Sequence, residues 1–248
     1  MKIFHCQLQA YAKRQVISSL EANDLVFLLG KPLTGKSTLL SLLFARIDFT
    51  RKIWPIIIRS SHSHLSGSLR QSLVSALGLP SWVVDNSNSA LLSVLREVNS
   101  RDLTVVLVID DIDSFVKGGF SRYPELCEFI QFLRKEIKGL KVVVTMTNYN
   151  RIDTLAEDFK SGRHSLITLN SWQASEDLAS FVIYVAKAYS IKKHQVVGED
   201  FLSALHLSTR GATGAIIQTV KILAMSGVLA NGKVATSENI SQLWMFKS

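Results

Sequence analysis

Short apolar runs alternate with amphipathic segments along the first 170 residues of the chain. The apolar runs lie at 25–29, 53–59, 103–109, 140–147 and 166–169. Runs of this length and composition are typical of strands that are buried on both faces. Helical spacing of apolar residues marks the segments 7–20, 37–45, 65–77, 89–98 and 123–137. Strands that alternate with helices predict an α/β fold with a doubly wound parallel sheet.

The pattern changes after Trp172, where only helical spacing remains. The amphipathic segments there are 175–189, 200–207, 212–225 and 237–244. Such a change from a mixed to a purely helical pattern indicates a second folding unit. We therefore expect an α/β core at residues 1–170 and a helical lid at residues 171–248.

Composition allows a large core and provides no sign of a membrane protein. Hydrophobic residues make up 47% of the 248 residues. No apolar run reaches the roughly 18 residues that a membrane span needs, and the first residues lack the apolar stretch of a signal peptide. Cys6 and Cys127 are too few for a disulfide framework or a zinc site. We expect two free thiols, a cytoplasmic location and no membrane partner.

The chain is basic, with a net charge of +8. This charge favours an anionic partner, and nucleic acid is the obvious candidate. Residues 171–248 carry seven Lys or Arg and five Asp or Glu. Most of the positive excess therefore belongs to the α/β core.

A glycine-rich turn follows the first apolar run and precedes a helical segment. It reads Gly-Lys-Pro-Leu-Thr-Gly-Lys-Ser from Gly30 to Ser37 and fits the phosphate-binding pattern G-x-x-x-x-G-K-[ST]. Its glycines let backbone N–H groups face a phosphate, at the N-terminus of the helix. Lys36 is placed to neutralise the β- and γ-phosphates, and the Ser37 hydroxyl to bind Mg²⁺. We expect nucleotide contacts from Gly30, Lys31, Pro32, Leu33, Thr34, Gly35, Lys36, Ser37 and Thr38.

Two carboxylates end the most apolar run, Val105 to Asp111, in a Walker B pattern. This strand can lie beside the phosphate-loop strand, and ligands bind in the crevice at the carboxyl ends of parallel strands. There Asp110 would hold Mg²⁺, and Asp111 would orient the attacking water as a base. The alternative for Asp111 is a solvated or helix-capping carboxylate, and we expect that bland role for Asp113.

The order of these motifs resembles the AAA+ ATPases of the origin-recognition, ExeA and transposition group. The resemblance rests on GKPLTGKS, VVLVIDDID, VVVTMTN and the helical lid, and it covers nearly the whole chain. It implies ATP hydrolysis with Mg²⁺, with ATP bound between core and lid. It also implies assembly into a ring or filament when ATP binds.

The resemblance assigns three further residues. Asn148, after the strand that follows Walker B, would be sensor 1 and orient the water and the γ-phosphate. Arg163 would be the arginine finger that reaches a neighbouring subunit, with Arg151 as its rival. Arg210, before a lid helix, would contact phosphate as part of sensor 2. The alternative for Asn148 is that it only begins the following turn, where asparagine is favoured. The alternative for each arginine is that it only faces solvent.

Within this group the chain is most similar to TnsC- and TniB-type transposition ATPases. The features are its short length, the LG-x-P ending at Leu77 to Pro80, and the ending from Val234 to Ile240. This similarity implies an ATPase that binds double-stranded DNA, selects it as a target, and recruits a transposase or other partner protein. The alternative is a switch that controls protein assembly without DNA, and a small-molecule kinase is a third reading.

DNA contacts would be made mainly to phosphates and would therefore depend on salt. The candidate residues are Lys117, Arg122, Arg134, Lys135, Lys138 and Lys141, each of which could instead belong to a solvated face. The pair His62 and His64 has the spacing of metal ligands, but a third ligand is missing nearby, so we expect no metal site there.

Overall fold

The chain forms two compact units that each draw on separate parts of the sequence. In the computed structural model the described residues are 7–44, 48, 50–59, 69–77, 87–117, 122–147, 150, 152–159 and 162–245. One unit contains Ala12–Leu29 and Lys36–Thr168, and the other contains Met1–Tyr11, Gly30–Gly35 and Leu169–Ser248. The phosphate-loop residues Gly30–Gly35 thus share a unit with the C-terminal helices.

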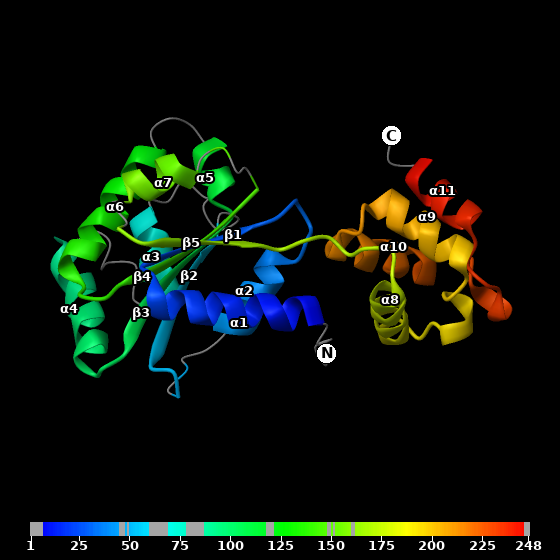
Figure 1. The fold of residues 1–248 in the computed structure, drawn as a ribbon, viewed down its shortest axis with the longest axis horizontal. Helices are drawn as coiled ribbons and strands as arrows, with labels where there is room; N and C mark the ends of the chain where they lie inside the picture. The colour runs from blue at the N-terminus through cyan, green and yellow to red at the C-terminus, as the bar shows by residue number, and fades with distance from the viewer. Residues whose placement is uncertain are drawn as a thin grey trace. The chain divides into compact units, whose positions relative to one another are not determined.

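A five-stranded parallel sheet forms the centre of the first unit (Figure 1). The strands are β1 (Leu25–Leu29), β2 (Ile53–Arg59), β3 (Thr104–Asp110), β4 (Lys141–Met146) and β5 (His164–Thr168). Their order across the sheet is β2-β3-β4-β1-β5. All four pairings are parallel, which confirms the predicted α/β class.

The order of the strands separates the two motifs. The Walker B strand β3 does not lie beside the phosphate-loop strand β1, because β4 is inserted between them. Spacing along the chain cannot reveal this order, since any crossover long enough to contain a helix can skip a strand. Asp110 still contacts Ser37, because α2 (Lys36–Phe44) packs against β2 and β3.

Helices cover both faces of the sheet (Figure 1). Those of the first unit are α1 (Gln7–Ala22), α2, α3 (Leu69–Ala76), α4 (Ser87–Ser100), α5 (Ile112–Lys117), α6 (Arg122–Glu136) and α7 (Ile152–Asp158). Alternate strand residues such as Leu25, Phe27 and Leu29 join one large core with α3 to α7. The intervening residues Val26 and Leu28 are also fully buried, and α1 and α2 lie on that other face.

The second unit has a core of its own. Its helices are α8 (Glu176–Ala188), α9 (Glu199–Thr209), α10 (Thr213–Met225) and α11 (Ser237–Met245). Trp172, which precedes α8, is 3% exposed and stacks on Phe181 with ring centroids 4.6 Å apart. The remaining core residues come from all four helices, so the unit closes around one apolar cluster.

Several element boundaries differ from those predicted. The short helices α5 and α7 were not predicted, because segments of six and seven residues show too little periodicity. Strand β5 begins at His164, and its burial alternates because it lies at the edge of the sheet. Residues 65–68 of one predicted helix lie outside the described part. The division at residue 170 stays a prediction.

None of the helices among the described residues is long and apolar enough to cross a membrane.

Candidate nucleotide-binding and catalytic site

The phosphate loop closes through contacts of its own residues. The Thr34 hydroxyl donates to the Lys31 carbonyl at 2.9 Å, and Thr34 is 3% exposed. Only glycine fits at position 30, because a Cβ there would lie 2.7 Å from Thr34 Oγ1 and 2.8 Å from the Leu169 carbonyl oxygen. Gly35 has a φ of 99°, which a residue with a side chain rarely adopts. The sequence pattern therefore corresponds to a loop built around its two glycines.

Leu33 occupies a strained position in this loop. Its φ is 65°, in the left-handed region that costs a residue with a Cβ about 1–2 kcal/mol. The side chain is 52% exposed, so burial offsets little of that cost. Strain of this kind is typical of functional loops whose surroundings fix the backbone.

Lys36 opens α2 and lies in the field of three carboxylates. Burial lowers the pKa of its ammonium group from the ordinary value of 10.5. The negative charges of Asp111, Asp113 and Asp110, in this order of strength, oppose that shift. The structure therefore brings the predicted phosphate-binding lysine near both predicted acids of the Walker B strand.

Ser37 and Asp110 meet directly. The Ser37 hydroxyl donates to Asp110 Oδ1 at 3.0 Å, although the two residues are 73 positions apart in sequence. Thr145 of β4 donates to the same oxygen at 2.9 Å. A hydroxyl and a carboxylate are the hard oxygen ligands that Mg²⁺ prefers. Among the described residues no group of three or more His, Cys, Asp or Glu could hold a metal.

Asp111 follows Asp110 in an unusual backbone conformation. Its φ is 65°, and its N–H donates to Thr145 Oγ1 at 2.7 Å. Its carboxylate accepts a hydrogen bond from the Ser114 hydroxyl in the first turn of α5. This bond joins two side chains, whereas the carboxylate of a helix cap accepts a backbone N–H. The base role of Asp111 stays a prediction.

Asp113 links α5 to the end of β4. Its Oδ2 accepts two hydrogen bonds from Thr147, one from the N–H and one from the hydroxyl, each 2.6 Å long. The residue was expected to be a solvated or capping acid, and neither role predicts this contact between α5 and the end of β4. Asp113 therefore fixes the tip of β4, next in sequence to Asn148.

The start of α10 contacts the phosphate loop within the second unit. The Gly214 N–H donates to the Leu33 carbonyl at 2.7 Å, and the Thr213 hydroxyl to the Thr34 carbonyl at 3.1 Å. Thr213 also accepts a hydrogen bond from Trp172 Nε1 at 3.0 Å. The first N–H groups of a helix have no partner inside it, so the loop carbonyls take that place.

Arg210 lies just before this contact, at the end of α9. It adopts φ 51° and ψ 32° as the left-handed C-cap of α9, and its side chain is exposed. The residues that face the loop are instead Thr213 and Gly214. The phosphate contact of Arg210 stays a prediction.

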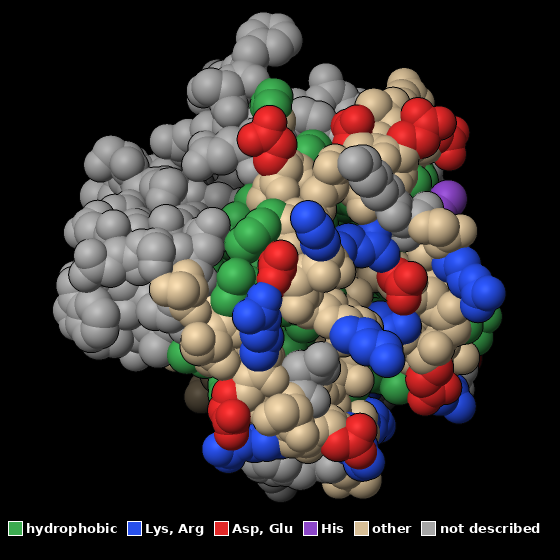
Figure 2. Space-filling model, turned by 90° about the vertical axis from the view of Figure 1, so that its left-hand side faces the viewer, with side chains coloured by type: hydrophobic (Ala, Val, Ile, Leu, Met, Phe, Trp, Pro, Cys, Tyr) green, Lys and Arg blue, Asp and Glu red, His purple; other side chains and the backbone are tan. Residues whose placement is uncertain are grey.

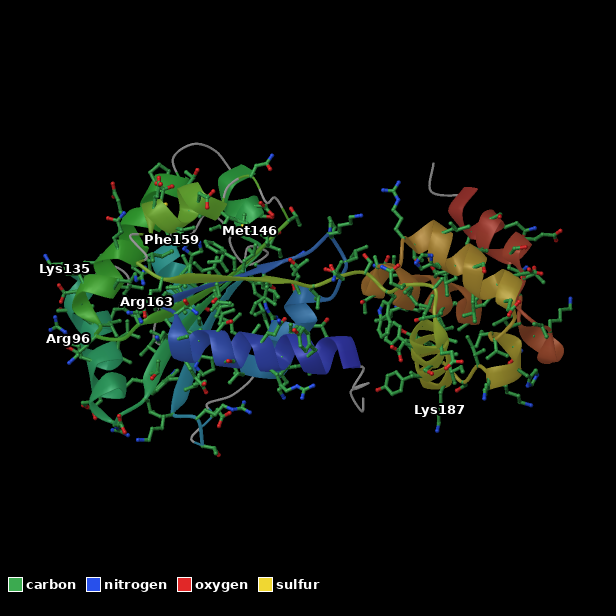
Figure 3. All side chains as sticks on the ribbon, viewed as in Figure 1. Arg96, Lys135, Met146, Phe159, Arg163 and Lys187 are labelled. Atoms are coloured by element: carbon green, nitrogen blue, oxygen red, sulfur yellow. The ribbon has the colours of Figure 1, made fainter. Side chains whose placement is uncertain are left out.

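Arg163 lies at the amino ends of the strands. It precedes His164, which pairs with Leu25 at the start of β1, whereas Leu29 ends that strand. Five strand residues span about 16 Å at ~3.3 Å each. Figure 3 shows Arg163 and Met146, the last residue of β4, at opposite ends of the sheet. Arg163 is therefore remote from Asp110, which ends β3. Its role as an arginine finger stays a prediction.

Several predicted residues lie outside the described part of the chain. They are Asn148, Arg151, His62, His64 and Cys6, together with the side chains of Lys117 and Arg122. The roles of Asn148 and Arg151 stay predictions. Cys127 is buried as a free thiol, as expected.

Two of the candidate DNA contacts are engaged elsewhere. Arg134 and Lys141 both contact Asp24, at 3.6 and 3.1 Å, and their side chains are only 15% and 19% exposed. Arg134 also donates to the Phe159 carbonyl at 2.8 Å. Lys135 and Lys138 are exposed. On the face that carries α4 and α6, basic side chains lie among acidic ones (Figure 2).

The sequence reasoning missed Thr145, Thr213 and Gly214. Thr145 could have been noticed, because a hydroxyl in a strand buried on both faces needs a partner. The hydrogen bond from Arg59, at the end of β2, to Ser41 Oγ at 2.9 Å was also missed. No signal in the sequence marks the α10 contact, because it depends on how the helices fold back on the loop.

The fold is similar to those of several solved ATPases and replication proteins. The ORC1 protein of Aeropyrum pernix, solved in complex with DNA, matches with a TM-score of 0.71 and 15% identity, over 96% of this chain and 65% of that chain. A Walker-type ATPase of Pyrococcus abyssi matches with a TM-score of 0.64 and 16% identity, over 99% and 74%. Domain III of the replication initiation protein DnaA of Thermotoga maritima matches with 0.62 and 14%, over 98% and 94%.

The family is identified by sequence. No curated protein matches the chain. A profile of the AAA domain, however, matches residues 20–155, which is more than half of the chain. The match includes the phosphate loop and Asp110, and this family of P-loop proteins implies ATP hydrolysis. The chain belongs to the AAA domain family.

Proposed function

We propose that this protein hydrolyses ATP with Mg²⁺ and uses the nucleotide state to control its assembly. The observation that carries the proposal is the meeting of Ser37 with Asp110 Oδ1 at 3.0 Å beside the phosphate-binding lysine. Ser37 and Asp110 would hold the magnesium ion, which neutralises charge that develops on the phosphates. Lys36 and the N-terminus of α2 would hold the phosphates in position.

Asp111 and Asn148 are the proposed residues for the attacking water. Asp111 would accept its proton, and Asn148 would orient it against the γ-phosphate. The hydrogen bond from Ser114 holds the Asp111 carboxylate in one place. Phosphoryl transfer depends mainly on such positioning and on charge neutralisation.

Arg163 is the proposed finger for a neighbouring subunit. Its position at the amino end of β5, away from Asp110 at the carboxyl end of β3, supports a role outside its own site. Hydrolysis would then require a ring or filament, and loss of the γ-phosphate would weaken the assembly.

We further propose that the assembly forms on double-stranded DNA and serves in target selection for transposition, by recruiting a transposase or another partner. The net charge of +8 supports an anionic partner. The similarity in fold to an ORC1 protein solved with DNA supports the same class of partner. Contacts to phosphates would make the binding sensitive to salt.

The alternative is an ATP-dependent switch that acts on protein partners without DNA. One observation favours it: Arg134 and Lys141 are mostly buried and share Asp24 as an ion-pair partner, so part of the basic charge is less available to DNA. Lys135 and Lys138 remain as exposed candidates.

A test compares ATP turnover with and without duplex DNA, at low and at moderate salt, with electron micrographs of the same samples. We expect DNA to increase turnover, ATP to produce rings or filaments on DNA, and salt to reduce both. Lys36→Ala should abolish all three. If ATP turnover is the same with and without DNA, and assembly occurs without DNA, the result would contradict DNA binding and support the protein switch.

A further inference from the structure

Thr145 is a polar residue in the buried, mostly apolar strand β4. Every residue of β4 from Val142 to Met146 is buried, and Thr145 is 0% exposed. A hydroxyl buried in this way costs free energy unless it forms hydrogen bonds. Valine has nearly the same shape and would suit an apolar strand better. The hydroxyl therefore needs an explanation in terms of its partners.

Both partners of the hydroxyl are in the Walker B segment. Thr145 Oγ1 donates its one proton to Asp110 Oδ1 at 2.9 Å. The same oxygen accepts the Asp111 N–H at 2.7 Å. The backbone pairing of β3 with β4 ends at Ile109 and Val144. The Thr145 side chain thus continues the link between β3 and β4 one residue beyond the last backbone pair, at the position of Asp110.

The two bonds fix the orientation of both acids. Asp110 Oδ1 is held from one side by Ser37 of α2 and from another by Thr145 of β4. Asp110 Oδ2 takes part in no hydrogen bond among the described residues, so it is the oxygen left open. The Asp111 N–H is held while its backbone has the strained φ of 65°.

We propose that Thr145 is a positioning residue for the magnesium site, acting through Asp110. The inference rests on the proposed Mg²⁺-dependent ATPase function. Thr145 touches neither nucleotide nor water in this account, which distinguishes it from Asn148. It holds the Asp110 carboxylate so that one oxygen binds the two hydroxyls and the other stays open for the ion or its water. Residues that orient metal ligands typically contribute about 10–100-fold to metal affinity or activity.

The test uses variants that differ in a single hydroxyl group. Thr145→Val keeps the shape and removes the hydroxyl. Thr145→Ser and Thr145→Ala differ from each other only in the hydroxyl. If the valine variant does not fold, this pair still compares a side chain with the hydroxyl to one without it. Thr219→Val is the matched control, because Thr219 is also buried but its hydroxyl donates only to Ala215 of its own helix.

The measurement is the affinity for a fluorescent ADP analogue, titrated with Mg²⁺ and in EDTA, together with the Mg²⁺ concentration that half-saturates ATP hydrolysis. For Thr145→Val and Thr145→Ala we expect at least about a tenfold rise in the Mg²⁺ requirement. Their affinity in EDTA should stay within about twofold of wild type, since the hydroxyl acts only through the ion site. Thr145→Ser and Thr219→Val should resemble wild type.

An unchanged Mg²⁺ requirement in the variants without the hydroxyl would overturn the proposal. An equal loss of affinity with Mg²⁺ and in EDTA would also overturn it, because that pattern indicates a general structural role. These outcomes leave the proposed function intact as long as wild type hydrolyses ATP. If Mg²⁺ strengthens nucleotide binding by wild type but no ATP is hydrolysed, only the proposed ATPase function is contradicted. If Mg²⁺ does not change nucleotide binding by wild type, the ATPase function and the role of Thr145 are both contradicted.

Discussion

The proposed binding of nucleotide phosphates depends strongly on the positive charge of Lys36. Burial lowers its pKa, while the nearby carboxylates of Asp111, Asp113 and Asp110 oppose the shift. Bound phosphate would favour the charged form and raise the pKa again. The free protein therefore loses this charge at a lower pH than the nucleotide complex does.

We predict that nucleotide affinity falls as pH rises, beginning below the ordinary lysine value of 10.5. The charged ammonium binds phosphate, and in the free protein it deprotonates early because its pKa is lowered. Titrations with a fluorescent nucleotide between pH 7 and pH 10 measure this effect. Lys36→Arg keeps its charge throughout this range, so its affinity should stay flat. Parallel curves for wild type and Lys36→Arg would contradict the assignment.

Gly211 permits the sharp turn between α9 and α10. Its φ is 65°, and a Cβ there would lie 2.0 Å from the Trp172 carbonyl oxygen. The Trp172 N–H in turn donates to the Gly211 carbonyl at 2.8 Å. His206 Nε2 lies 3.0 Å from the same Trp172 oxygen. Two segments of backbone therefore approach each other closely at this glycine.

We predict that Gly211→Ala destabilises the protein by at least about 3 kcal/mol, because left-handed strain adds to an overpacking cost. Gly227→Ala is the matched control, since Gly227 has a φ of 71° but open space around it. It should cost only about 1–2 kcal/mol, from the strain alone. Denaturant titrations followed by circular dichroism compare the two. Equal losses would show that the contact with Trp172 has no effect.

At the scale of elements, the sequence predicts the strands well and their order poorly. Val105–Ile109 and Leu25–Leu29 are apolar on both faces, and this local property suffices to identify buried strands. The place of β4 between β1 and β3 depends on packing across the whole sheet, which spacing does not record.

The same difference between local sequence patterns and long-range packing applies to the candidate site. The phosphate loop and Asp110 could be found because their chemistry requires fixed residue types at fixed offsets. Thr145 acts through a contact between strands, Asp113 through a contact from α5 to the end of β4, and Thr213 through the return of a distant helix. None of these contacts depends on a short pattern. A hydroxyl in a buried strand marks Thr145 as a residue that needs a partner, but the sequence does not identify that partner.

The start of α10 provides a prediction for this element. Thr213→Val removes the hydrogen bond to the Thr34 carbonyl and leaves Trp172 Nε1 without its acceptor. A buried polar group left unpaired costs about 1–3 kcal/mol. We expect weaker nucleotide binding together with this loss of stability, because the phosphate loop loses its support. Thr219→Val should leave nucleotide affinity unchanged, and a similar decrease in both variants would contradict the special role of Thr213.

At the scale of the whole molecule, the position of Arg163 makes a prediction about subunits. The residue is exposed and lies at the amino ends of the strands, whereas the phosphate loop follows their carboxyl ends. If Arg163 completes a neighbour's site, two inactive variants can restore activity when they are mixed.

We predict that Arg163→Ala and Lys36→Ala are each inactive alone and that their mixture regains part of the wild-type turnover. The Arg163→Ala subunit supplies an intact phosphate loop, and the Lys36→Ala subunit supplies the arginine. Phosphate release across a series of mixing ratios measures the recovery. A mixture with no more activity than its components would contradict a role for Arg163 in the neighbouring site.

We propose that Asp110, held by Ser37 and Thr145, makes this chain a Mg²⁺-dependent ATPase. The most direct test is steady-state phosphate release by wild type, Asp110→Asn and the control Asp177→Asn, whose carboxylate is exposed on α8. We predict turnover that requires Mg²⁺ in wild type and in the control. Asp110→Asn should lose it more than about 100-fold while it stays folded, because metal-assisted charge neutralisation contributes several kcal/mol. Equal turnover in all three proteins would contradict the account.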